Sequence, residues 1–232
     1  MSDSARDAER SRAAKIALRN RLLTSRRSLS SNELAAAAAQ IRDQTVSLVR
    51  RRSPSVIAAY VPIGSEPGGS SLVAALAAEA QALTSDALTV LLPVLLPDGD
   101  LDWAAPASPA AGLPPDSGVP SGAGVPSGAG LSLVAGPRGL LEPGGPRLGP
   151  SAITTAELVF VPALAVDRRG LRMGRGGGSY DRALSRLPAT GGPLVVALLH
   201  DGELVDSVPS EPHDRPVHAA ITPGGGLTVF AD

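Results

Sequence analysis

The chain contains no cysteine, a single lysine and few aromatic residues: one tryptophan, two tyrosines and two phenylalanines among 232 residues. Without cysteine, a disulfide framework, thiolate chemistry and thiolate metal ligands are excluded. Long apolar runs are also missing, because proline or glycine breaks each hydrophobic stretch at strand length. The first residues, MSDSARDAERSRAAK, lack the apolar centre of a secretory signal. We therefore expect a soluble cytoplasmic protein without a membrane partner.

The charges are unevenly distributed although the formal net charge is only −1. Residues 1–52 carry twelve basic and five acidic side chains, and residues 53–232 carry nine and seventeen. A basic segment is typical either of a solvated helical face or of a contact with an anion. Lys15 is the one lysine among 21 basic residues. Its compact ammonium group is well suited to reaching a phosphate.

Two helices are predicted in the basic N-terminal part. Residues 8–27 lack glycine and proline, and they place Lys15 and Arg19 four positions apart on one helical face. A second helix is predicted from Ser30, because Ser30 and Glu33 have the spacing of a capping box, and Pro54 marks its end.

The remainder alternates between short apolar runs and helical patterns. Continuous apolar runs of this kind predict an α/β fold with a mostly parallel sheet that is covered on both faces. The predicted strands are 56–61, 88–93, 156–166, 194–200 and 218–222, and the predicted helices between them are 70–83 and 180–187.

One stretch interrupts this pattern. VPSGAG occurs twice in tandem, at 119–124 and 125–130, within a tract dominated by proline, glycine, alanine and serine. Such a composition buries too little apolar area to offset the entropy of ordering it. We expect about 105–130 to be a mobile surface insertion in a single domain that spans 1–232.

In the segment LRMGRGGGSYDRAL, residues 171–184, the eight positions from Arg172 to Ser179 hold four glycines and two arginines, and Asp181 follows two positions later. It is not a Walker A motif, because no GK[ST] follows the glycines, and it is not GxGxxG, because Ser179 stands at the third glycine position. Glycines allow successive backbone amides to converge on an anion, and Arg172 and Arg175 add charge. Asp181 could share a Mg²⁺ ion with phosphate oxygens. The alternative is a flexible loop in which Asp181 merely caps the following helix.

Four motifs together resemble the 5-formyltetrahydrofolate cyclo-ligase family, also called 5,10-methenyltetrahydrofolate synthetase. They are KIALR, YVPIGSEP, VPALAVDRRGLRMGRGGGSYDRAL and VPSEPHD, and the match runs from about residue 12 to 223. The resemblance implies a three-layer, Rossmann-like α/β domain. It also implies that ATP and Mg²⁺ drive ring closure of 5-formyltetrahydrofolate to 5,10-methenyltetrahydrofolate, with release of ADP and phosphate.

The resemblance assigns roles to particular residues of this chain. Lys15 and Arg175 would be catalytic, and Asp181 and Asp214 would bind Mg²⁺. The implied ATP contacts are Lys15, Arg19, Arg172, Gly174, Arg175, Gly176, Gly177, Gly178, Ser179 and Tyr180. The implied substrate contacts are Arg19, Tyr60, Val61, Glu66, Arg175, Gly176, Gly177, Gly178 and Ser179. A carboxylate such as Glu66 suits a pterin because it accepts hydrogen bonds from the amino and ring N–H groups.

The family chemistry fits these residue types. A formamide oxygen is a weak nucleophile, and its phosphorylation would give an iminium phosphate that N10 attacks to close the ring. Phosphoryl transfer depends mainly on positioning and charge neutralisation, so basic side chains, backbone amides and Mg²⁺ suffice and no general base is nominated.

The chain departs from the family pattern at two places. Many members carry two aromatic residues where this chain has Ser179 and Tyr180, and His218 stands where an acidic residue is common. Trp103 is a candidate for stacking on the substrate or for ordinary packing. Glu142 could serve a turn or the substrate.

The three histidines of the chain are the last candidates for a metal site. His200, His213 and His218 are too far apart for a zinc signature, and we expect His200 to be structural.

Two functions are alternatives to the enzyme. One is a non-catalytic folate- or nucleotide-binding relative, and the other is a nucleic-acid-binding role for the basic segment. The favoured interpretation is a monomeric ligase with no nucleic-acid partner.

Overall fold

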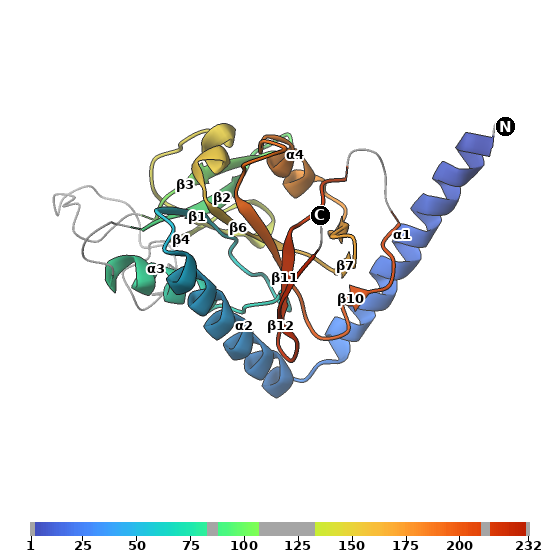
Figure 1. Ribbon diagram of the computed structural model, residues 1–232, viewed down its shortest axis with the longest axis horizontal. Coiled ribbons are helices and arrows are strands. Elements are labelled where there is room, and N and C mark those ends of the chain that lie inside the picture. Colours follow the sequence, from blue (N-terminus) through green and yellow to red (C-terminus); the bar gives the residue numbers. More distant parts are fainter. Residues whose placement is uncertain (1–2, 83–87, 107–132, 210–213, 231–232) are drawn as a thin grey trace.

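The computed structural model describes residues 3–82, 88–106, 133–209 and 214–230, and it is built around a seven-stranded sheet (Figure 1). The strand order is β12-β11-β9-β6-β1-β2-β3. The four pairings in the middle of the sheet are parallel, and β3 and β12 add antiparallel edges. The strands are β1 (Val56–Ala58), β2 (Thr89–Leu95), β3 (Leu101–Ala104), β6 (Leu158–Pro162), β9 (Leu194–Leu198), β11 (Ala219–Thr222) and β12 (Gly226–Val229).

Both faces of the sheet are buried, which explains the continuous apolar runs in the sequence. In β6, Leu158 and Phe160 belong to one buried cluster and Val159 and Val161 to another. Since successive side chains of a strand point to opposite faces, the two clusters lie on opposite sides of the sheet. The predicted mostly parallel α/β fold is thus confirmed.

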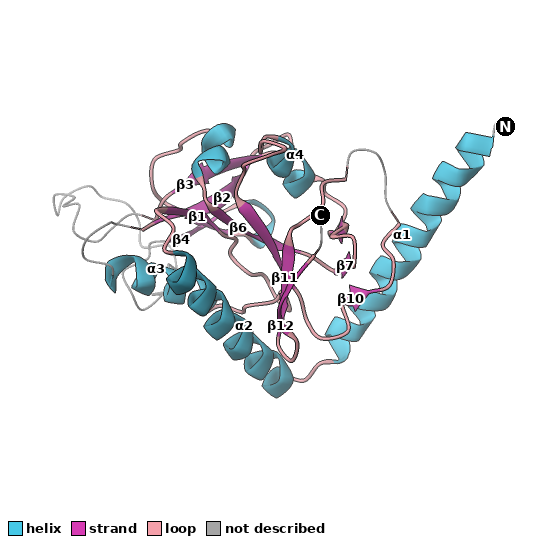
Figure 2. Cartoon of the chain, in the orientation of Figure 1, coloured by secondary structure: helices cyan, strands magenta, loops and turns pink. Residues whose placement is uncertain are grey.

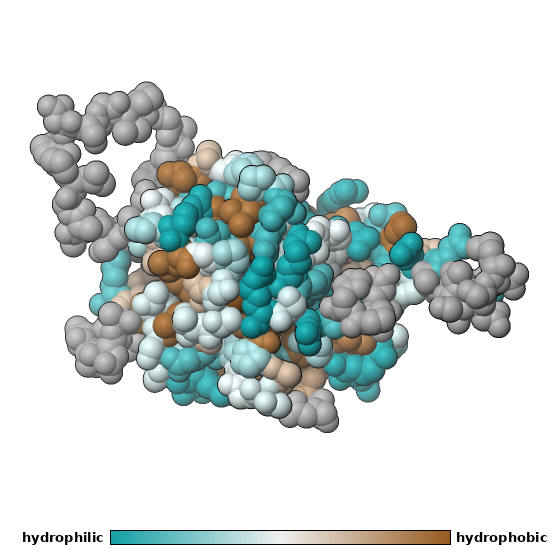
Figure 3. Space-filling model, turned by 90° about the horizontal axis from the view of Figure 1, so that it is seen from above, coloured by the Kyte–Doolittle hydropathy of each residue, from teal (hydrophilic) through white to brown (hydrophobic). Residues whose placement is uncertain are grey.

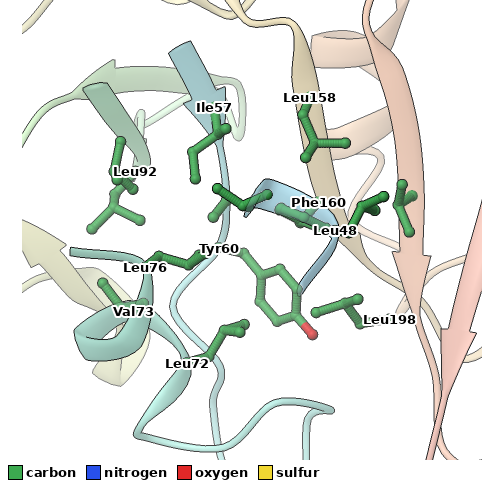
Figure 4. Close-up of a cluster of buried hydrophobic side chains, with 14 of the residues drawn as sticks. Leu48, Ile57, Tyr60, Leu72, Val73, Leu76, Leu92, Leu158, Phe160 and Leu198 are labelled. Carbon is green, nitrogen blue, oxygen red and sulfur yellow. The ribbon is translucent and has the colours of Figure 1, made fainter. Parts of the chain in front are cut away.

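Helices cover each face and form a three-layer arrangement (Figure 2). On one side, α2 (Ser31–Arg52) and α3 (Leu72–Ala82) pack over the cluster around Tyr60 and Phe160 shown in Figure 4. On the other side, α4 (Ser179–Ser185) and the 3-10 turn η2 (Pro150–Thr155) contact β3 and each other. This sandwich leaves the carboxyl ends of the parallel strands open for a site.

Helix α1 (Asp3–Ser28) lies apart from these layers, and its N-terminal end projects away from the body (Figure 1). Its C-terminal half packs through Leu22 on a small sheet with the order β10-β7-β8. These strands are β7 (Ala165–Asp167), β8 (Arg172–Met173) and β10 (Leu204–Val205). The buried side chain of Arg26 strengthens the contact through two bonds to the Glu203 carboxylate, of 2.6 and 2.8 Å.

A hairpin of β4 (Leu133–Ala135) and β5 (Leu141–Pro143), joined through the 3-10 turn η1 (Pro137–Gly139), completes the elements. None of the described helices is both long and apolar enough to cross a bilayer. On the face shown in Figure 3, hydrophobic residues occur in small groups between hydrophilic ones.

The second predicted helix has the expected ends. Ser30 is its N-cap, and the reciprocal contacts of the capping box with Glu33 are both present. The predicted strand 156–166 is wrong as one element, because the chain turns after Pro162 and continues as β7 in the other sheet. The predicted insertion at about 105–130 lies outside the described residues from position 107 onward.

Candidate functional site

A cavity of about 500 Å³ opens at the carboxyl ends of β1, β2 and β6, where the parallel sheet predicts a ligand site. Its wall combines residues of α1, the segment after β1, the glycine-rich loop 174–178 and Asp214. The cavity brings together all of the predicted site residues. They are Lys15, Arg19, Tyr60, Val61, Glu66, Arg172, Gly174, Arg175, Gly176, Gly177, Gly178, Ser179, Tyr180, Asp181 and Asp214.

The glycine-rich loop approaches α1 closely. The Nε atom of Arg19 donates a hydrogen bond to the carbonyl oxygen of Gly174 at 3.2 Å. Gly176 adopts a φ of +105°, and a Cβ atom placed there would lie 3.4 Å from the Arg19 guanidinium carbon. Gly178 is also left-handed, with a φ of +68°, and it is the N-cap of α4. The glycines therefore allow backbone geometry and proximity that a larger residue would strain.

Arg172 precedes this loop in the sequence and lines the same cavity. Its side chain is 3% exposed, and it donates to the Asp181 carboxylate and, at 3.4 Å, to the carbonyl oxygen of Pro162. Its buried Nε atom has no hydrogen-bond partner within the described residues. The alternative in which Asp181 caps α4 is wrong, because the cap residue is Gly178 and no side chain caps the helix.

The two carboxylates predicted to bind a metal each face a basic residue. Asp181 pairs with Arg172, and Asp214 accepts a 2.9 Å bond from the Lys15 ammonium group. Within the described part of the chain, no three histidine or acidic residues cluster as metal ligands. Two carboxylates beside a phosphate-type loop nevertheless fit Mg²⁺, which usually takes one or two protein carboxylates and completes its shell with phosphate and water oxygens.

Glu66 occupies the other end of the cavity. Its side chain is 9% exposed, accepts a 3.0 Å bond from the Ile63 amide and lies 3.4 Å from the Nε atom of Arg175. Burial raises the pKa of Glu66, while the Ile63 hydrogen bond and the Arg175 charge act in the opposite direction. A largely buried carboxylate of this kind can accept hydrogen bonds from a ligand and orient it.

The two tyrosines of the site differ in their hydroxyl contacts. Tyr60 is buried, and its hydroxyl donates a 2.6 Å bond to the Pro67 carbonyl oxygen. Burial raises the pKa of Tyr60 well above its usual value. The hydroxyl of Tyr180 is buried without a partner among the described residues. Burial also raises the pKa of Tyr180, so both phenols stay protonated and can donate.

Three other candidates lie elsewhere. Trp103 is 0% exposed within the sheet core and is not a cavity residue, so its packing role is confirmed and its stacking role is wrong. The Glu142 carboxylate accepts a 2.9 Å bond from the Leu95 amide and thereby ties β5 to β2, which is neither of the two predicted roles. His218 accepts a 2.9 Å bond from the Val195 amide.

His200 is buried, as expected of a structural residue, but it is not fully satisfied, because its buried Nδ1 atom has no hydrogen-bond partner among the described residues. Its Nε2 atom lies 2.9 Å from the Ser65 carbonyl oxygen, and its backbone amide donates to Glu203 at 2.7 Å. His213 lies outside the described residues.

The sequence analysis missed Arg26 as a cavity residue. A signal for it exists, because Arg26 follows Lys15 by eleven positions and Arg19 by seven, spacings that return to the same face of a helix. Its pairing with Glu203 was not visible, since 177 positions separate the two residues.

The chain is similar to known proteins over most of its length. A model of the 5-formyltetrahydrofolate cyclo-ligase family matches residues 11–223. A 5-formyltetrahydrofolate cyclo-ligase of Mycolicibacterium smegmatis is 37% identical over 217 residues, which cover 94% of this chain and 97% of that protein. An Escherichia coli protein of the same name is 35% identical over 71 residues, 31% of this chain and 38% of its own.

Two solved structures share the fold. The 5,10-methenyltetrahydrofolate synthetase of Aquifex aeolicus superposes with a TM-score of 0.68 at 23% identity, covering 94% of this chain and 93% of its own. The corresponding synthetase of Mycoplasma pneumoniae gives a TM-score of 0.60 at 16% identity, with coverages of 89% and 96%. The chain therefore belongs to the 5-formyltetrahydrofolate cyclo-ligase family, a family of ATP-dependent ligases of folate one-carbon metabolism.

Proposed function

We propose that this protein catalyses the ATP- and Mg²⁺-dependent cyclisation of 5-formyltetrahydrofolate to 5,10-methenyltetrahydrofolate, with release of ADP and phosphate. The observation that carries the proposal is the position of Arg175. Its guanidinium group belongs to the glycine-rich loop and lies 3.4 Å from the Glu66 carboxylate. A phosphate held by the loop and a pterin held by Glu66 would therefore meet at one side chain.

The basic residues supply the triphosphate end of the site. Lys15 and Arg19 reach the cavity from α1, and Arg172 and Arg175 reach it from the loop region. Backbone amides of Gly176, Gly177 and Gly178 would add donors, as glycine-rich loops do around phosphate. The resulting concentration of positive charge favours the negative charge that accumulates during phosphoryl transfer.

The folate would lie toward Glu66. Its buried carboxylate would accept hydrogen bonds from the pterin amino and ring N–H groups, and Tyr60 and Val61 line the same cavity. Burial removes water from the Glu66 carboxylate and raises its pKa. A pterin that donates two hydrogen bonds would replace the lost water and would therefore favour the ionised form of Glu66. The contact thus selects for a ligand with adjacent N–H donors.

Asp181 and Asp214 would hold the Mg²⁺ ion, which supplies charge neutralisation for the phosphate oxygens. Each carboxylate is at present paired with a basic residue of the cavity, Arg172 or Lys15. When nucleotide binds, these basic residues can turn from the carboxylates to the phosphates. Lys15 and Arg172 would therefore neutralise the carboxylates in the free protein and the phosphates in the nucleotide complex.

The reaction needs two bond exchanges. The formyl oxygen attacks the γ-phosphorus, the bond to the bridging oxygen breaks, and ADP leaves. N10 then attacks the activated formyl carbon and loses its proton, the carbon–oxygen bond breaks, and phosphate leaves. Arg175 would contact both the transferred phosphoryl group and the formyl oxygen, and Lys15 would stabilise the charge on the phosphates.

A turnover assay tests the proposal. Purified protein mixed with 5-formyltetrahydrofolate and Mg²⁺ should produce the absorbance of the methenyl product only when ATP is added, with one ADP per product. Folded protein that binds both substrates tightly but gives no product would instead support the non-catalytic relative. An Arg175→Ala variant with retained binding provides the matched inactive control.

A further inference from the structure

The turn between β2 and β3, Leu96 to Asp100, contacts α4, the helix that directly follows the glycine-rich loop. Its own shape is fixed by two hydrogen bonds between Leu96 and the residues Gly99 and Asp100, both of 2.9 Å. Gly99 has a φ of +83°, which directs its carbonyl oxygen toward α4. These hydrogen bonds hold the turn in one conformation, so it can support a neighbouring segment.

Two side chains of α4 converge on that single carbonyl oxygen. The Ser179 hydroxyl donates to Gly99 at 2.6 Å, and the Nη2 atom of Arg182 donates to the same oxygen. The Arg182 guanidinium group also donates to the carbonyl oxygen of Gly177, inside the loop, at 3.3 Å. Arg182 thus joins the turn directly to the loop backbone.

An ion pair between Arg186 and Asp100 adds a further link between the turn and the end of α4. Arg186 donates to both carboxylate oxygens of Asp100, and its Nη1 atom also donates to the Arg182 carbonyl oxygen at 2.9 Å. Asp100 is 8% exposed, so the pair is shielded from solvent on the carboxylate side. We call Gly99, Asp100, Ser179, Arg182 and Arg186 the turn clamp.

The loop needs such support because four of its five residues are glycines. Glycine loses more conformational freedom on ordering than any other residue, so an unsupported loop would have to be ordered by the ligand itself. Arg19 holds the beginning of the loop through Gly174, whereas the turn clamp holds its end. A loop fixed at both ends binds an anion without that entropic cost.

We propose that Arg182 is a positioning residue for the reaction, and that the turn clamp sets the geometry of the phosphate-binding loop before nucleotide arrives. Arg182, Arg186 and Gly99 are not residues of the cavity wall described above. The proposal also gives Ser179 a role, because its hydroxyl ties the start of α4 to the turn. This inference rests on the proposed function in naming phosphate as the ligand of the loop.

Gly99→Ala separates geometry from charge. A Cβ atom at Gly99 would lie 2.9 Å from the Nη2 atom of Arg182 and would displace the guanidinium group while leaving its charge in place. Gly149→Ala is the matched control, since Gly149 has a similar φ of +87° and nothing lies within 4 Å of the added atom. Both variants place an alanine at a positive φ, but only Gly99→Ala puts the added atom against the clamp.

The first measurement is hydrogen exchange of the Arg182 backbone amide in the free protein, because that amide donates to the Gly178 carbonyl oxygen, at the end of the loop, at 3.0 Å. Gly99→Ala and Arg182→Gln should each lower the protection factor of this amide about fivefold or more relative to Gly149→Ala, because the clamp no longer holds the end of the loop. Arg182→Lys, which keeps one charged donor, should fall between Arg182→Gln and the wild type. Equal exchange in Gly99→Ala and Gly149→Ala would overturn the proposal.

The second measurement is the affinity of the same proteins for a non-hydrolysable ATP analogue with Mg²⁺. We expect Gly99→Ala and Arg182→Gln to bind about fivefold or more weakly, and Gly149→Ala to bind as the wild type does. If Gly99→Ala retains wild-type affinity, the clamp does not position the loop for nucleotide. If the wild type itself binds no nucleotide, the proposed function fails, whereas the exchange rates still decide whether the clamp orders the loop.

Discussion

At the scale of single residues, the cavity pairs basic side chains with carboxylates, and under the proposed function ATP and Mg²⁺ would replace these partners. Lys15 and Arg172 are paired with Asp214 and Asp181. The sequence identified these four residues through their motifs. It could not show their pairing, because 199 positions separate Lys15 from Asp214 and only the folded chain brings them together.

Lys15→Ala should weaken the contact with ATP more than the contact with folate. Loss of a charge-assisted hydrogen bond of about 1.5–3 kcal/mol predicts a KM for ATP that rises about tenfold or more. The KM for 5-formyltetrahydrofolate should change by less than about threefold. Steady-state kinetics with each substrate varied in turn measures both constants.

Arg21→Ala is the matched control for that experiment. Arg21 is an exposed basic residue of the same helix and does not belong to the described cavity wall. An equal rise in the KM for ATP in both variants would mean that the overall charge of α1, rather than the position of Lys15, attracts the nucleotide.

Glu66→Gln should show the opposite preference. Gln keeps the size and the acceptor for the Ile63 amide but loses the charge that two pterin donors require, so the KM for folate should rise about tenfold or more. The KM for ATP should stay close to that of the wild type. A variant whose KM for ATP rises instead would place Glu66 at the nucleotide end of the cavity.

The same substitution tests the electrostatics of the free protein. Burial raises the folded-state pKa of Glu66 above its ordinary value of 4.5, so the folded chain binds a proton more readily than the unfolded chain. The wild type therefore loses this contribution to stability as pH rises from about 4.5 through the folded-state pKa. Glu66→Gln lacks that loss, and its melting temperature relative to the wild type should increase between about pH 4 and about pH 7. A constant difference would contradict the burial argument.

At the scale of elements, the sequence predicts what local chemistry determines. The capping box of α2 and the buried runs of β6, β9 and β11 follow from residue type and spacing alone. The break between β6 and β7 does not, since it depends on Leu164 and Ala165 packing against α1 through Leu22. The edge strands β3 and β12 were missed as well, because their identity rests on pairing with β2 and β11 rather than on a long apolar run.

The attachment of α1 provides an element-scale prediction. Arg26 and Glu203 have side chains that are 2% and 5% exposed, so Arg26→Met leaves an unpaired buried carboxylate. Such a loss typically costs about 3–5 kcal/mol of unfolding free energy. Chemical denaturation of the variant measures this value directly. The control is Arg50→Met, which removes the exposed partner of Glu79 and should change the unfolding free energy little.

A result within about 1 kcal/mol of the wild type for Arg26→Met would show that the ion pair does not secure α1. Because Lys15 and Arg19 lie on the same helix, the variant should also weaken nucleotide binding when α1 shifts. The combination of both effects distinguishes loss of helix attachment from a local change in stability.

At the scale of the whole molecule, the cavity joins segments from both ends of the chain. Residues of α1, the segment after β1, the glycine-rich loop and the late segment at Asp214 form one wall. That the chain forms one domain across 1–232 stays a prediction. A ligand that contacts all of these segments must stabilise the folded state against unfolding, because it binds only when they are assembled.

An ATP analogue with Mg²⁺ should therefore raise the unfolding free energy. At a concentration of one hundred times its dissociation constant, the gain is about 2.7 kcal/mol, or about 5–10 °C in melting temperature for a chain of this size. Thermal unfolding with and without the analogue measures the shift. The same concentration applied to Lys15→Ala should give a smaller shift, and equal shifts would argue against a contact between Lys15 and the nucleotide.

The central claim is that the glycine-rich loop holds the terminal phosphates of ATP beside a folate that is bound by Glu66. The most direct measurement is a crystal structure with a non-hydrolysable ATP analogue, Mg²⁺ and 5-formyltetrahydrofolate. We predict the γ-phosphate on the amides of residues 176–178 and next to Arg175, with the formyl oxygen facing it. A triphosphate located outside this cavity, or a pterin without contact to Glu66, would contradict the account.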